Sequence, residues 1–115
     1  MPFEPEPHLF AILNDPCPDK LCLVVMVTTI YSNRVHDPAC LLDAGDHPFI
    51  KHPSYVLYRR ASLVRASQII TCTAQGLYVP KEDFPPAAYQ RIRDGLYDSE
   101  ETKRAMINYA VAVGI

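Results

Sequence analysis

The sequence predicts one mainly β domain that ends in two α-helices. The chain has 115 residues, of which 49% are hydrophobic and 21% are charged, a composition typical of a single globular domain. Before residue 80 it is rich in β-branched and aromatic residues, whereas apolar residues spaced by three and four appear only after residue 85. Short strands separated by brief turns are typical of a small barrel or a strongly curved sheet. We therefore expect a single domain over residues 1–115, with a barrel over about 8–80 and helices over about 85–113.

The strongest strand prediction covers Leu21–Ile30, which is apolar on both faces until Thr28 and Thr29, as a buried central strand would be. His8–Leu13 predicts a shorter strand, because the Asn-Asp-Pro sequence that follows it is a turn signal. Further strands are expected over Ala39–Leu42, Ser54–Ala61 and Gln68–Cys72.

The last 35 residues predict two helices. The first begins at Pro85 or Pro86, because proline is tolerated in a first helical turn, and it ends near Tyr97. Ser99 is the expected N-cap of the second helix, and Gly114 is its expected stop. The apolar stripe of this helix must be covered, so we expect a homodimer or a bound partner. The stripe is Ala105, Met106, Tyr109, Ala110 and Val113.

Charge and composition restrict the possible partners and the compartment. Eleven basic and thirteen acidic residues give a net charge of −2, so any binding of nucleic acid must rely on a local patch. The opening MPFEPEPHLF lacks the basic and apolar regions of a secretory signal, and the longest apolar run, Leu21–Val27, is too short to span a membrane. We therefore expect a cytoplasmic protein with reduced cysteines and no membrane partner.

Two groups of residues have the types and the approximate spacing of metal ligands. In the first, the segment between Cys22 and His36 resembles a β-strand, whereas it is largely helical in small zinc fingers, so we expect no metal there. In the second, Gly-Asp-His-Pro has turn composition, and a simple turn and a functional loop both stay open as alternatives. The first group is Cys17, Cys22, His36 and Cys40, and the second is Asp46, His47 and His52 with Asp37 and His36.

Two further patterns are suited to contact with a polyanion. Thr28 and Thr29 end an apolar strand shortly before Arg34, and hydroxyl donors beside a guanidinium can hold a phosphate, although threonine is also favoured in strands. Basic residues interleaved with tyrosines can bind a nucleic-acid backbone and stack bases, although a charged strand edge has the same composition. This second set is Lys51, Tyr55, Tyr58, Arg59, Arg60 and Arg65.

These segments together resemble a known family. HLFAILND, a proline-rich loop and LVVMVTT, followed by HPSYVLYRRASLV, are similar to the opening strands and a later strand of the PemK/MazF-like toxins of type II toxin–antitoxin systems. The resemblance implies an SH3-like barrel that usually dimerises. It also implies a metal-independent endoribonuclease without a cofactor, neutralised by a protein antitoxin.

The resemblance also implies roles for individual residues. Thr28 falls on the family's Thr/Ser position with Thr29 beside it, Ser54 begins the later strand, and His8 replaces the catalytic arginine. RNA cleavage without metal needs groups that exchange protons and donors to the phosphate. We therefore expect catalysis by His8, Thr28, Arg34 and His47, and RNA binding by Thr29, Ser54, Tyr58, Arg59 and Arg60.

Two other functions remain as alternatives. A non-catalytic SH3-like module that binds a protein segment is favoured by the missing arginine and by the net negative charge. A metal-dependent site would use His36, Asp46, His47 and His52.

Overall fold

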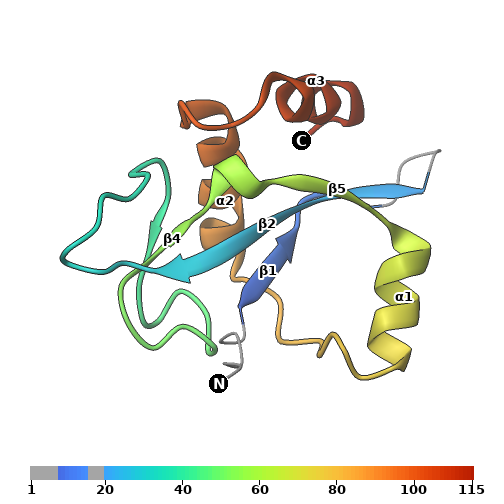
Figure 1. Ribbon diagram of the computed structural model, residues 1–115, viewed down its shortest axis with the longest axis horizontal. Helices are drawn as coiled ribbons and strands as arrows, with labels where there is room; N and C mark the ends of the chain where they lie inside the picture. The colour runs from blue at the N-terminus through green and yellow to red at the C-terminus, as the bar shows by residue number, and fades with distance from the viewer. Residues whose placement is uncertain (1–7, 16–19) are drawn as a thin grey trace.

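The computed structural model describes residues 8–15 and 20–115, and it shows a small, compact mixed α/β domain (Figure 1). In this part of the chain a five-stranded antiparallel sheet is combined with three α-helices and one short 3₁₀-helix. The strands are β1 (Leu9–Ile12), β2 (Leu21–Thr29), β3 (Leu41–Leu42), β4 (Ser54–Val56) and β5 (Ser62–Arg65). The helices are η1 (Tyr58–Arg60), α1 (Ala66–Ala74), α2 (Pro86–Asp98) and α3 (Arg104–Val113).

Strand β2 is the centre of the sheet, as its uninterrupted apolar sequence predicts. Val27 pairs with Leu9 of β1 and with Val56 of β4, so β1 and β4 lie on opposite edges of β2. Strand β5 pairs with the first half of β2, on the edge that β4 occupies further along, and η1 joins the two. Strand β3 then adds to β4, which gives the order β1-β2-β4-β3.

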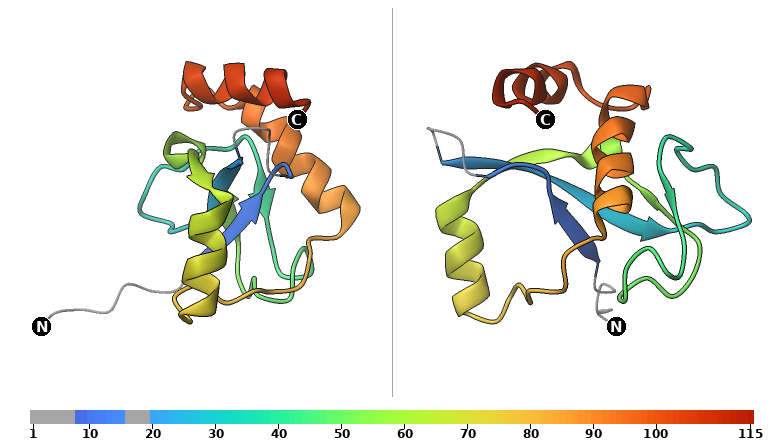
Figure 2. Two further views of the ribbon diagram at one scale, coloured as in Figure 1. Left: turned by 90° about the vertical axis from the view of Figure 1, so that its right-hand side faces the viewer. Right: turned by 180° about the vertical axis from the view of Figure 1, so that it is seen from behind.

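One face of this sheet forms the core. The side chains of Leu23, Val25 and Val27 alternate with more exposed neighbours and are buried against Ile92 and Leu96 of α2. Helix α2 lies behind the sheet in Figure 1 and in front of it in the rear view of Figure 2. The proline-first helix that the sequence predicts is confirmed, because α2 begins at Pro86 and ends at Asp98.

The strand predicted over Gln68–Cys72 is wrong, because these residues lie in helix α1. Strand β2 begins at Leu21, which pairs with Arg65, the last residue of β5. Beyond Arg65 no length of β2 remains to pair with, so the backbone satisfies its hydrogen bonds within a helix. Propensity alone misleads here, because the segment is rich in Ile and Thr.

The strand predicted over Ser54–Ala61 is only half right. It stops at Val56, and Tyr58–Arg60 form η1 because the Tyr58 ring turns into the core. Its hydroxyl donates a hydrogen bond of 2.6 Å to the carbonyl of Ile92 in α2.

The second C-terminal helix begins at Arg104, so the prediction that Ser99 is its N-cap is wrong. Ser99 instead ends α2, where its hydroxyl donates to the buried carboxylate of Asp37 and accepts the N–H of Glu101 at 3.0 Å. The predicted stop at Gly114 is confirmed, because this residue closes α3 with a φ of 80°.

The apolar stripe of α3 is covered largely by its own chain. Ala110 is fully buried in the core, and Met106 and Tyr109 pack against the core from its edge. The Tyr109 hydroxyl also donates to the carbonyl of Leu21 at 3.0 Å. Ala105 of the stripe is exposed, and the homodimer or bound partner expected from the sequence stays a prediction. Among the described residues, no helix is both long and apolar enough to cross a membrane.

Candidate functional site

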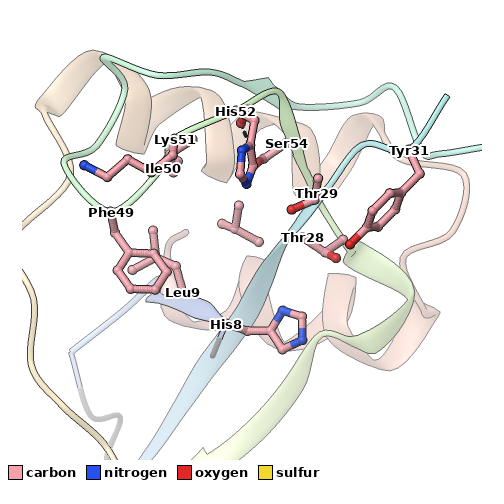
Figure 3. A pocket seen from close by; sticks show the side chains of 11 residues that line it. His8, Leu9, Thr28, Thr29, Tyr31, Phe49, Ile50, Lys51, His52 and Ser54 are labelled. Carbon is pink, nitrogen blue, oxygen red and sulfur yellow. Dashed lines mark hydrogen bonds between the residues drawn. The ribbon is translucent and has the colours of Figure 1, made fainter. Parts of the chain in front are cut away.

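A shallow pocket lies where β2 ends, between the start of β1 and the segment that leads into β4 (Figure 3). Its volume of about 120 Å³ is well below that of a usual pocket for a small-molecule ligand, so it suits a single group such as one phosphate. The residues that line it are His8, Leu9, Val27, Thr28, Thr29, Tyr31, Phe49, Ile50, Lys51, His52 and Ser54.

The register of the sheet explains why His8, Thr28, Thr29 and Ser54 meet here. Leu9 pairs with Val27, so the residue before it, His8, lies beside Thr28. On the other edge of β2, Thr29 pairs with Ser54. Four of the residues that the sequence analysis assigned to catalysis or RNA binding thus line one pocket.

Ser54 is buried, and its hydroxyl donates a hydrogen bond of 2.9 Å to the carbonyl of His52. This contact closes the turn that precedes β4. Ser54 therefore orients the backbone of His52. Thr28 and Thr29 both line the pocket, and as successive residues of β2 they leave the strand on opposite faces.

His47 does not line the pocket, although the sequence analysis expected it to carry a proton. Its ring is 2% exposed, and both of its nitrogens bind backbone groups. Nδ1 accepts the N–H of Phe49 at 3.0 Å, so the proton is on Nε2, which donates to the carbonyl of Glu82 at 2.6 Å. The ring also packs against Phe84, with 4.7 Å between ring centroids. His47 therefore ties the segment before β4 to the segment before α2.

Asp46 has a similar role in the same segment. One carboxylate oxygen accepts the N–H of Asp43 at 2.8 Å, and the other pairs with Arg91 of α2 at 2.7 Å. The Gly-Asp-His-Pro sequence is thus a turn that two side chains fasten to the rest of the domain. This turn positions the residues that follow it, up to His52.

Lys51 and His52 complete the pocket. From the sequence, Lys51 was named only in the set of basic residues and tyrosines, and His52 only as a possible metal ligand. Figure 3 shows His52 and His8 on opposite sides of the pocket. None of the described lining residues is acidic, and Lys51 supplies a positive charge. The pairing of Thr29 with Ser54 could have identified His52, since it places the residues just before β4 beside the threonines.

The remaining predicted residues lie outside the pocket. Arg34 is exposed and its guanidinium lies 5.6 Å from the ring centroid of Tyr31, so it flanks the rim. Arg59 and Arg60 are exposed on η1. Tyr58 is 0% exposed and offers no ring face to a base. Burial raises the pKa of Tyr58, and it also raises the pKa of the neighbouring Cys40 thiol.

No group of three or more His, Cys, Asp or Glu side chains within 8–15 and 20–115 is arranged to hold a metal ion. His47 and Asp46 of the second candidate group bind a backbone carbonyl and an arginine instead. In the first candidate group, Cys22 and Cys40 are buried, and Cys17 lies outside the described residues.

Comparison of the chain with protein-family models, with curated proteins and with solved structures finds no match.

Proposed function

We propose that the protein is a metal-independent endoribonuclease of the PemK/MazF-like toxin type, with an SH3-like barrel as its scaffold. The observation that supports this function best is the placement of His8 and His52 on opposite sides of one small pocket that two threonines and a lysine also line. Histidines exchange protons near neutral pH, and a pocket without carboxylates among its described lining favours an anion.

The proposed reaction uses the ribose of the substrate as its nucleophile. The 2′-oxygen attacks phosphorus as one histidine accepts its proton, and the bond from phosphorus to the 5′-oxygen breaks as the other histidine protonates that oxygen. The products are a 2′,3′-cyclic phosphate and a free 5′-hydroxyl, and the step leaves the base protonated and the acid deprotonated. Groups on opposite sides of the phosphate suit this reaction, because the attacking and leaving oxygens lie on opposite sides of phosphorus.

The other polar groups stabilise the charge that develops on the phosphate. Lys51 contributes a charged donor, and Thr28 and Thr29 contribute neutral donors. Arg34 flanks the pocket beside Tyr31, so it contacts the neighbouring phosphate of a longer strand. The assignment therefore replaces His47 with His52 as the second proton carrier and keeps His8 and Thr28.

The test is cleavage of a mixed RNA pool by the purified protein, with and without EDTA, followed by mapping of the cut ends. We expect cleavage that EDTA does not reduce, with 5′-hydroxyl ends that polynucleotide kinase labels without prior phosphatase treatment. His8→Gln and His52→Gln keep a polar side chain but remove proton transfer, and each should lose cleavage while remaining folded. Absence of cleavage by the wild type in either condition would overturn the enzymatic proposal and favour a non-catalytic binding module.

A further inference from the structure

The face of the sheet opposite α2 exposes aromatic side chains beside the pocket. Phe10 of β1 is 52% exposed, and Tyr31, just after β2, is 47% exposed. Tyr55 of β4 is half-buried on the same face as Phe10. We call Phe10, Tyr31 and Tyr55 the aromatic face. This side of the sheet is turned toward the viewer in Figure 1, and none of the described helices lies over β1 and β4 there.

The register of the sheet makes this face continuous with the pocket. Phe10 is opposite Met26, and Tyr55 is opposite Thr28. Met26 and Thr28 are two residues apart in β2, so their side chains lie on the same face of the sheet. His8 precedes Phe10 by two residues, so the two side chains leave β1 on one side, about 6.8 Å apart along the chain. Tyr31 itself lines the pocket. A phosphate beside Thr28 would therefore have rings on both sides of it.

Charges around the aromatic face suit a polyanion. The Arg34 guanidinium lies over the ring of Tyr31, and the His36 ring lies 5.4 Å from the ring of Tyr55 at 44°. Lys51 lines the adjoining pocket. Flat rings that alternate with cations are the usual means of binding a single strand, because every base can stack and every phosphate needs a positive charge.

We propose that the aromatic face stacks the bases of single-stranded RNA on either side of the phosphate held in the pocket. The proposal rests on the proposed function, since it extends the same site from one phosphate to the flanking nucleotides.

The first test measures affinity for a fluorescently labelled mixed-sequence 2′-O-methyl oligoribonucleotide, which lacks the attacking hydroxyl and is not cleaved. Phe10→Ala and Tyr55→Ala should each weaken binding by about 5- to 150-fold, the usual effect of removing one stacking ring. Phe10→Leu should weaken binding almost as much, because it keeps an apolar side chain but loses the ring. Phe10→Tyr should bind as the wild type does. Ile70→Ala is the matched control, because Ile70 is 69% exposed on α1 and lies outside the aromatic face.

The second test uses the absence of tryptophan from the chain. Phe10→Trp introduces a single indole, and stacking on a base should quench its fluorescence when the oligonucleotide is added. Ile70→Trp provides a single indole on an apolar exposed position of α1, and its fluorescence should stay unchanged.

The outcomes separate this inference from the function on which it rests. If the wild type cleaves RNA but Phe10→Ala and Tyr55→Ala bind the oligonucleotide normally, the aromatic face is not the base-binding surface, although the endoribonuclease assignment stands. If Phe10→Leu binds as tightly as the wild type, the face acts as an apolar surface and stacking is refuted. If the wild type neither cleaves nor binds RNA, both proposals fail and the exposed rings suit a protein partner.

Discussion

His47 supports the fold, so replacing it should lower the free energy of unfolding and leave the cleavage rate of the folded protein largely unchanged. The ring is 2% exposed, forms hydrogen bonds of 2.6 and 3.0 Å, and packs on Phe84. His47→Phe keeps a ring of similar size but removes both hydrogen bonds, at about 1 kcal/mol each. His47→Ala also leaves a cavity, so we expect a total loss of about 3–4 kcal/mol.

These losses translate into measurable shifts in thermal unfolding. An unfolding entropy of about 2.1 cal/mol/K per residue gives about 0.24 kcal/mol/K for 115 residues, so each kcal/mol lowers the Tm by about 4 °C. His47→Phe should therefore lower the Tm by about 8 °C and His47→Ala by about 12–16 °C, as measured by circular dichroism.

Variants of His47 and His52 should differ in which property they lose, the Tm or the cleavage rate. At a temperature where all variants remain folded, His47→Phe should keep most of the cleavage rate, because the proton carriers are elsewhere. His52→Gln should lose the rate and leave the Tm unchanged, because His52 is exposed. A His47→Phe variant with the wild-type Tm and no cleavage would refute this assignment and return His47 to the reaction.

Three other predictions follow from packing, pH and the pocket. Gly95→Ala should lower the free energy of unfolding by about 1–3 kcal/mol in denaturant titration despite better helix propensity, because a Cβ there would lie 2.9 Å from Cζ of Tyr58 and 3.0 Å from Cβ of Cys40. Burial raises the pKa of Tyr58 above its ordinary value of 10.0, so the unfolded state loses that proton first. Stability should then be complete below about pH 10 and fall above it, and urea titrations at pH 8 and 11 should show a smaller fall for Tyr58→Phe. Thr28→Val should reduce cleavage by less than either histidine variant, because it removes one neutral donor, whereas Thr71→Val on α1 should have no effect.

The sequence predicts β1 and β2 better than the segments that follow them. Leu21–Thr29 and Leu9–Ile12 form strands where their apolar patterns place them, because both strands bury apolar side chains in the core. Helix α1 was missed because its conformation depends on where β2 begins, which local propensity does not encode. η1 was missed for a similar reason, since it depends on the contact of Tyr58 with α2.

The residues of the candidate site also differ in how well the sequence predicts them. His8, Thr28 and Thr29 could be predicted because they lie at the ends of two strands that pair in sequence order. His47 and His52 belong to one short segment with turn composition, and sequence alone does not show which ring points inward. The hydrogen bonds of His47 to Phe49 and Glu82 decide this, and the second of them joins residues 35 positions apart.

The central proposal is that His8 and His52 exchange the protons of RNA cleavage, and a pH–rate profile tests it most directly. The cleavage rate of one RNA should be measured from pH 4 to 10 for the wild type, His8→Gln and His52→Gln. We predict a bell-shaped profile for the wild type, because the histidine that accepts a proton must start neutral and the histidine that donates one must start protonated. Each variant should lose about 10²- to 10⁴-fold in rate and one limb of the bell. A wild-type profile that neither histidine variant changes would contradict the proposal.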